Sequence, residues 1–218
     1  MCLKDLIKFF SVKKAVNVIR LYLSFIISRF LKKSFISGLP FALSIEPTTS
    51  CNLGCPECPS GLKKFTRKKG NLSIALNKKI IDELKGRLTY INYYFQGEPY
   101  INKNFFDFVQ YANSKKIFCS TSTNGHFLND ENCVKTIESG LKRLIISIDG
   151  NSQETYEIYR KKGKYERVIE GTKNIIKWKK ELNSQYPHVI FQFLVFKTNE
   201  HLIEEMKTLA ANLGVDEL

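Results

Sequence analysis

The chain has 218 residues and a formal net charge of +13, from 34 Lys and Arg against 21 Asp and Glu. Its 6 Pro and 12 Gly exclude a collagen-like or low-complexity chain, and 6 Cys are too few for a disulfide scaffold of this length. No long uncharged apolar run is present, which excludes an ordinary membrane-spanning helix. The positive charge favours acidic partners, or reflects lysines scattered over exposed helix faces.

Residues 1–40 are predicted to form a basic amphipathic helical segment. Apolar residues recur at spacings of three and four from Leu6 to Leu31, and Asp5 is the only acidic residue. The most apolar stretch, 21–30, is too short to span a bilayer. Two interpretations remain open: the apolar stripe packs on the main domain, or it lies on an anionic membrane surface.

From residue 41 to residue 218 the pattern predicts one domain in which strands alternate with helices. We expect strands at 41–46, 89–95, 117–123, 143–148 and 189–196. We expect helices at 74–85, 104–114, 130–139, 165–182 and 202–213. Ser73 is a plausible N-cap of the first helix, and Asp130 lies near the start of the third. Regular alternation predicts a parallel sheet, either doubly wound or a barrel, with its site at the carboxyl ends of the strands.

Three cysteines follow the first predicted strand at C-x3-C-x2-C spacing: Cys51, Cys55 and Cys58. Gly54 and Pro56 allow this loop to turn back on itself. Soft thiolates this close together suit iron–sulfur or zinc, but a structural zinc site needs a fourth ligand and no other His or Cys lies nearby. A cluster with three protein thiolates leaves one metal position open to a substrate or cofactor.

This cysteine motif after the first strand of a βα repeat resembles the radical S-adenosylmethionine (SAM) superfamily, over residues 41–218. The resemblance implies a partial (βα)6 TIM-like barrel with parallel strands. It also implies that the three cysteines bind three irons of a 4Fe–4S cluster whose fourth iron is chelated by SAM. In that family, reductive cleavage of SAM gives a 5′-deoxyadenosyl radical, which abstracts a hydrogen atom from the substrate.

Further motifs fall after the next strands. Gly97, Glu98 and Pro99 are similar to the family's Gly-Gly-Glu-Pro segment, with Gln96 in place of the first glycine. The resemblance implies that this segment holds the amine of SAM. Asn124, in a Thr-Asn-Gly segment, either orders its loop or contacts the cofactor.

Ser147 lies in a Ser-x-Asp-Gly segment that resembles peptide-modifying members, in which the serine contacts SAM. Arg160 is the implied partner of the SAM carboxylate, although it could also be one surface charge among neighbouring lysines. Gln192 and Leu194 alternate on the fifth strand, and one of them is expected to touch adenosine. Glu57 stands where many members carry an aromatic residue, which is a departure from the family's pattern.

The residues around Cys58 resemble radical SAM proteins with a C-terminal SPASM domain, but no cysteine follows Cys133. This resemblance favours modification of a peptide, a protein or another small molecule, with a flavodoxin- or ferredoxin-like protein as reductant. The need for reduced thiols favours the cytoplasm, with membrane contact through residues 1–40 as a further alternative. The basic run 63–69 would also suit RNA or a phosphorylated small molecule.

The rival interpretation is a non-enzymatic zinc- or iron–sulfur-binding module that serves structure or partner recruitment. A further expectation concerns completeness. Residues 214–218 stand where a sixth strand should begin, so we expect a longer protein that supplies this strand and a Cys-rich C-terminal domain.

Overall fold

The computed structural model describes residues 9–218, so the first eight residues of the expected N-terminal segment lie outside it. Within this range the strands form one parallel sheet in the order β1-β2-β3-β4-β5. They are β1 (Ala42–Ser44), β2 (Tyr90–Asn92), β3 (Phe118–Thr123), β4 (Arg143–Ser147) and β5 (His188–Gln192). A doubly wound sheet reverses its strand order, and this sheet does not. The wall of a partial barrel is therefore confirmed.

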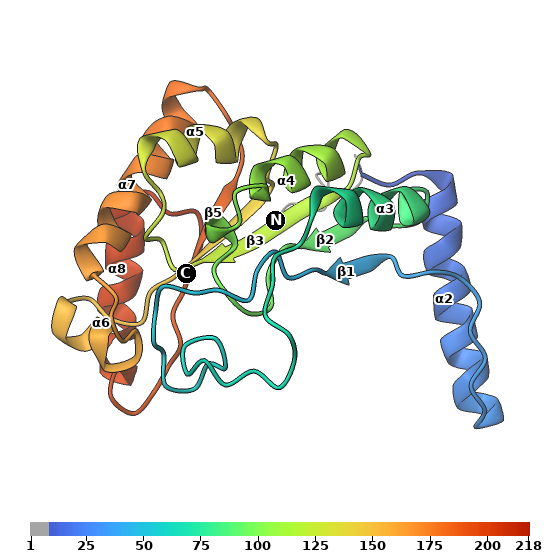
Figure 1. Ribbon diagram of the computed structural model, residues 1–218, viewed down its shortest axis with the longest axis horizontal. Helices are drawn as coiled ribbons and strands as arrows, with labels where there is room; N and C mark the ends of the chain where they lie inside the picture. Colours follow the sequence, from blue (N-terminus) through green and yellow to red (C-terminus); the bar gives the residue numbers. More distant parts are fainter. Residues whose placement is uncertain (1–8) are drawn as a thin grey trace.

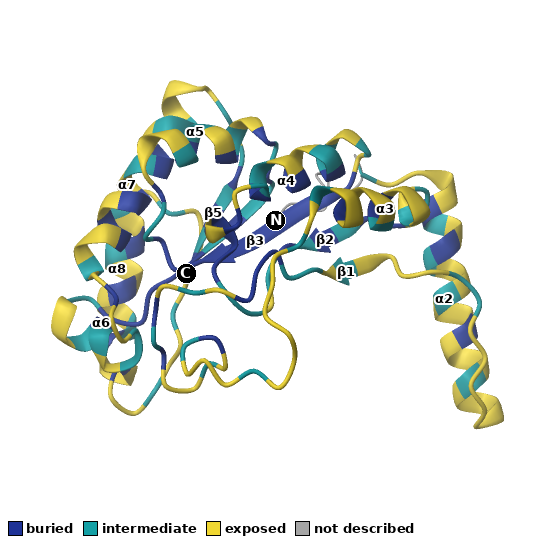
Figure 2. Cartoon of the chain, viewed as in Figure 1, coloured by how far each residue is buried: buried dark blue, intermediate teal, exposed yellow. Residues whose placement is uncertain are grey.

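Helices cover the outer face of this wall (Figure 1). They are α3 (Ile74–Leu84), α4 (Phe105–Ser114), α5 (Asp130–Glu138), α7 (Tyr165–Glu181) and α8 (Ile203–Leu213). The core lies between these helices and the sheet, and it is formed by buried side chains from both layers. Figure 2 shows buried residues in the strands and along these helices. All five of these helices match the predicted ones.

The helix caps explain where these helices begin. The hydroxyl of Ser73 accepts the backbone N–H of Leu76, as predicted. In α5, Asp130 is the first residue of the helix, near whose start it was expected, and the cap is Asn129, whose side chain accepts the N–H of Asn132. Three short helices were not predicted: η1 (Pro99–Ile101), α6 (Gln153–Tyr159) and η2 (Glu200–Leu202).

Helix α2 (Val12–Leu31) lies at the end of the sheet where the strands begin (Figure 1). Its first turn is anchored, because the buried ammonium of Lys14 donates to the carbonyl of Lys116 over 2.6 Å. Its apolar stripe is exposed, with Val12 at 81% and Phe30 at 88%. The interpretation that this stripe packs on the main domain is therefore wrong for α2, whereas Phe9, before the helix, does pack edge-on against the ring of Phe118. No helix among residues 9–218 combines the length and apolarity needed to cross a membrane.

The last residues of the chain run beside β5. Glu217 pairs with Ile190 in parallel, and the N–H of Phe191 donates to the carbonyl of Glu217 over 2.8 Å. This is the place where a sixth strand was expected to begin. That a longer protein completes the barrel stays a prediction.

Candidate cofactor site at the strand ends

A cavity of about 180 Å³ lies at the carboxyl ends of the strands. It brings together all but one of the residues that were expected to bind the cluster or SAM. Its lining consists of Cys51, Leu53, Cys55, Cys58, Ser60, Tyr94, Gly97, Glu98, Ser122, Thr123, Asn124, Ser147, Tyr159, Arg160, Gln192 and Leu194. Pro99 is the exception: it is buried at the start of η1 and does not line the cavity.

The three cysteines of the motif are free thiols held by the surrounding loop. The sulfur of Cys51 accepts the N–H of Leu53 over 3.4 Å, and the thiol of Cys58 lies 3.6 Å from the amide oxygen of Gln96. Burial raises the pKa of Cys51 to about 11 and also raises the pKa of Cys55. The positive charge of a metal would therefore be needed to make these buried thiols good ligands.

The donor set fits an iron–sulfur cluster better than one zinc ion. Nowhere in residues 9–218 do three His, Cys, Asp or Glu side chains converge closely enough to hold a single metal ion. The three thiols instead line a shared cavity without a fourth protein ligand of the kind a structural zinc site needs. The other two described cysteines, Cys119 and Cys133, are fully buried in the hydrophobic core.

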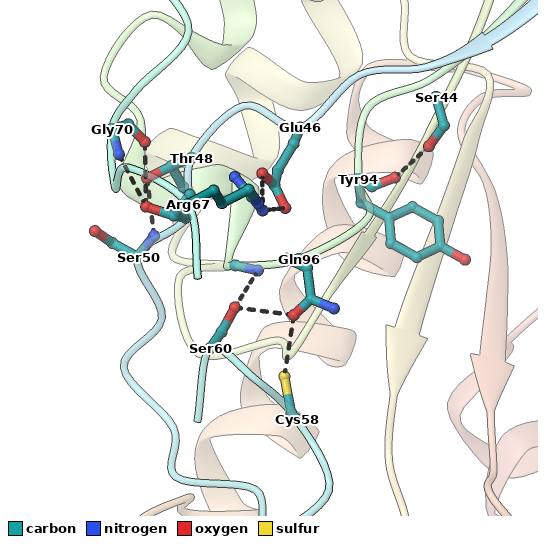
Figure 3. Close-up of polar contacts among 12 residues, drawn as sticks. Ser44, Glu46, Thr48, Ser50, Cys58, Ser60, Arg67, Gly70, Tyr94 and Gln96 are labelled. Atoms are coloured by element: carbon teal, nitrogen blue, oxygen red, sulfur yellow. Dashed lines mark hydrogen bonds and ion pairs between the residues drawn. The ribbon is translucent and has the colours of Figure 1, made fainter. Parts of the chain in front are cut away.

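The cysteine loop is tied to the end of β2 through Gln96 (Figure 3). The hydroxyl of Ser60 donates to the amide oxygen of Gln96 over 3.2 Å and accepts the N–H of Gly97 over 2.9 Å. Further along the loop, Arg67 forms an ion pair with Glu46 (Figure 3). The departure of Gln96 from the family's glycine thus has a local role, because its side chain connects the cysteine loop to the second strand end.

Gly97 and Glu98 form a turn that a larger residue could not make. Gly97 has a φ of +78°, and a Cβ there would lie 2.1 Å from the carbonyl oxygen of Thr48. The Glu98 carboxylate is 2% exposed and accepts hydrogen bonds of 2.8 Å from the hydroxyl of Thr123 and the N–H of Asn124. Burial raises the pKa of Glu98 to about 7, although these donors oppose the shift.

Asn124 and Ser147 lie on the third and fourth strand ends. The Asn124 amide donates to the side-chain oxygen of Asn52 in the cysteine loop over 2.7 Å, so it does order its surroundings. Ser147 lies opposite Gln192 in the register of β4 and β5, and its hydroxyl is 3.4 Å from that of Ser122. These contacts place small polar groups along one side of the cavity.

Arg160 is not a surface charge, because it forms a buried ion pair with Asp149. The two side chains are 13% and 0% exposed. The other carboxylate oxygen of Asp149 accepts the N–H of Leu194 over 2.8 Å, and Asn199 donates to the Asp149 carbonyl. Asp149 thus positions both Arg160 and the end of β5. Asp149 belongs to the Ser-x-Asp-Gly motif, which by itself predicted no role for it.

The loops that carry the cysteines and Arg160 are joined by a backbone hydrogen bond. The N–H of Gly54 donates to the carbonyl of Lys161 over 2.9 Å. Sequence reasoning also missed two aromatic residues of the cavity lining, Tyr94 and Tyr159, of which the second packs against Phe196. Tyr94 lies two residues beyond Asn92, the last residue of β2, so its place just after a strand was the signal that could have found it.

Comparison with known proteins gives a family. The radical SAM superfamily matches residues 45–210. The mycofactocin maturase MftC of Mycolicibacterium smegmatis is 30% identical over 84% of this chain and 45% of its own length. The PqqA peptide cyclase of Rhodopseudomonas palustris is 26% identical over 83% of this chain and 46% of its own length. The chain thus spans about half the length of these curated relatives.

The fold of a solved structure agrees. The crystal structure of Streptococcus suis SuiB bound to S-adenosylmethionine covers 87% of this chain and 42% of its own, with a TM-score of 0.67 and 16% identity. Members of the matched family are enzymes that use a 4Fe–4S cluster and SAM, the two cofactors implied by the sequence motifs. This chain belongs to the radical SAM superfamily.

Proposed function

We propose that this chain is the catalytic core of a radical SAM enzyme that modifies a peptide or protein. One observation carries the proposal: the three cysteines of the motif and the residues expected at SAM line the same cavity. The names of the relatives, a maturase and a peptide cyclase, support a peptide or protein substrate over another small molecule.

In this proposal Cys51, Cys55 and Cys58 hold a 4Fe–4S cluster. When it is bound and reduced, the cluster supplies the electron that cleaves SAM to methionine and a 5′-deoxyadenosyl radical. The chain's own residues bind and orient the reactants and exclude water from them. A flavodoxin- or ferredoxin-like protein would deliver the electron, in the cytoplasm.

Two charged residues hold the polar end of SAM in this proposal. The Glu98 carboxylate binds the amine, because an ammonium beside it favours the charged form that burial disfavours. The Arg160 guanidinium, oriented by Asp149, binds the SAM carboxylate. Gly97 and Ser147 line the space around the polar end of SAM, and Leu194 lies against its adenosine.

Nucleic acid is the weaker substrate class. Within the basic run 63–69, Arg67 is paired with Glu46 and also lies 4.9 Å from the ring centroid of Phe65. Phe65 is the only aromatic residue of the run, and the guanidinium of Arg67 already lies over its ring. A surface that binds nucleic acid combines cations with exposed aromatic rings on which bases stack, and this run therefore lacks a free ring for stacking.

Anaerobic reconstitution tests the proposal. The protein should take up iron and sulfide, turn brown and form 5′-deoxyadenosine from SAM when a reductant is added. Cys119→Ala is a matched control. Cys119 lies in the core, so this substitution should leave the cluster intact. A colourless protein that binds zinc and does not cleave SAM would establish the rival metal-binding module instead.

A further inference from the structure

Helix α2 presents its polar side to the protein and its apolar side to solvent. Asn17, at 3% exposed, exchanges two hydrogen bonds with the backbone of Leu39, of 2.7 and 2.9 Å. Further along the helix, the hydroxyl of Ser28 exchanges two hydrogen bonds of 2.9 Å with the backbone of Phe35. The returning segment 33–41 therefore covers the polar face, which leaves the opposite face open.

That open face is a continuous apolar stripe. Its members recur every three or four residues and are all exposed: Val12, Val16, Ile19, Leu23, Ile26 and Phe30. Figure 2 shows most of α2 exposed along its length. Single apolar residues on a surface are ordinary, but a contiguous stripe of this length marks an interaction site.

Only positive charges border this stripe. At about 100° per residue, Lys13 and Arg20 fall on one border and Arg29 on the other, each roughly a quarter turn from the centre of the stripe. Residues 9–45 contain no Asp or Glu, and Lys32 and Lys33 follow the helix directly. Long basic side chains on the borders of an apolar face can reach phosphates while the face itself lies among acyl chains.

A hollow beside the stripe is likewise lined by apolar and positively charged side chains. It has a volume of about 400 Å³ and lies between α2 and residues 86–87. Val12 and Val16 form part of its apolar surface, and Lys13, Arg20 and Arg87 bring three cationic groups to it. Apolar walls with cations around them suit a phosphate headgroup attached to acyl chains.

We propose that α2 docks this protein on an anionic phospholipid surface. A second copy of the chain fits less well, because two such helices paired along their stripes would bring Lys13, Arg20 and Arg29 near one another without an acidic residue to neutralise them. The carboxyl ends of the strands, where the cavity lies, point away from α2 (Figure 1), so a docked protein would keep the cavity open. This inference does not depend on the proposed function.

The experiment uses the full chain and co-sedimentation with vesicles. It should bind vesicles of phosphatidylcholine mixed with phosphatidylglycerol, bind phosphatidylcholine alone much more weakly, and lose binding as salt is raised. The double substitution Ile19→Glu and Ile26→Glu should lower the partition coefficient about tenfold or more, because burying each isoleucine is a large part of the driving force. Leu76→Glu, at an exposed position of α3, is the matched control and should bind like the parent.

Charge is tested separately. Arg20→Glu with Arg29→Glu should weaken binding to the mixed vesicles, whereas Lys78→Glu with Lys79→Glu on α3 should have a smaller effect. Circular dichroism and melting should match the parent, because all these side chains are exposed. No vesicle binding by the parent, or equal binding by the isoleucine variant, would overturn the proposal. So would a dimer in solution that the isoleucine variant dissociates, since a second copy would then occupy the stripe.

Discussion

Cys51, Cys55 and Cys58 differ from Cys119 and Cys133 in their surroundings. The first three line the cavity, whereas the other two are packed in the core. We expect Ala at any one of the first three positions to abolish cluster assembly and SAM cleavage, because two thiolates cannot hold the cluster with its open iron in place. Visible absorbance and iron content after reconstitution measure this.

The same reconstitution assay compares a cysteine of the core with the cysteines of the motif. Cys133→Ala should keep cluster absorbance, with a modest loss of stability from the buried thiol that is removed. A variant at Cys133 that lost the cluster, beside a Cys58 variant that kept it, would show that the cavity has been assigned the wrong thiols.

Glu98 and Arg160 lead to a prediction about SAM affinity. Glu98→Gln and Arg160→Ala should each weaken SAM binding about ten- to a hundred-fold, because a hydrogen bond to a charged group contributes roughly 1.5–3 kcal/mol. Iron content should stay at the parent's level, since neither residue belongs to the cysteine motif. Calorimetric titration of the reconstituted protein with SAM measures the loss, and unchanged affinity in both variants would reject these two roles.

Sequence motifs predicted most of the cavity at the level of single residues. The cysteines and Glu98 were found because they lie in the loops that follow β1 and β2, and parallel strands bring their carboxyl ends together. Pro99 was misplaced because the turn at Gly97 leads straight into a 3₁₀ helix that carries Pro99 into the interior. Asp149 was overlooked because its role depends on Arg160, 11 residues later, which only the folded chain brings next to it.

At the scale of elements, Asp149 connects the ends of β4 and β5 to α6. Asp149→Asn should weaken SAM binding about tenfold, because a neutral amide holds the Arg160 guanidinium less firmly. The loss should be smaller in the double variant with Arg160→Ala than the sum of the two single losses, as expected for residues that act together. Asp82→Asn on α3, an exposed carboxylate, is the control.

Helices were predicted more accurately than strands, for a physical reason. The five long helices carry clear apolar periodicity, and their observed ends agree with the predicted ones within one residue. The strands β1, β2 and β5 are shorter than predicted, since apolar and aromatic residues continue past Ser44, Asn92 and Gln192 although the strands end there. Helix α6 was missed because its 7 residues are too few to show periodicity, although Ser152 and Thr155 form a capping box at its start.

At the scale of the whole molecule, the buried Glu98 should make stability depend on pH. Its pKa rises from the usual 4.5 to about 7 in the fold, so the folded state binds more protons than the unfolded state between these values. The stability it contributes is fully present below about pH 4.5 and is lost as pH rises through about 7. The expected loss is on the order of 3 kcal/mol for the protein without cofactors.

Denaturant unfolding of that protein at several pH values measures this effect against Glu98→Gln. The variant cannot titrate at this position, so its stability should fall less than the parent's between pH 5 and pH 8, a range that covers most of the interval between the two pKa values. His126 has a pKa lowered by burial and acts in the opposite direction, but it contributes equally to both proteins. Parallel curves for the two proteins would show that Glu98 is already charged in the fold.

The hydrogen bond between Gly54 and Lys161 adds a link through the protein between cluster binding and SAM binding, beside the direct contact expected between SAM and the open iron. Whatever orders the cysteine loop must also restrict the segment that carries Arg160, and the reverse holds by thermodynamic linkage. A loaded cluster should therefore slow amide hydrogen exchange in residues 159–163, before any SAM is added. By the same reciprocity, SAM should slow the loss of iron to a chelator, so each cofactor would protect the other.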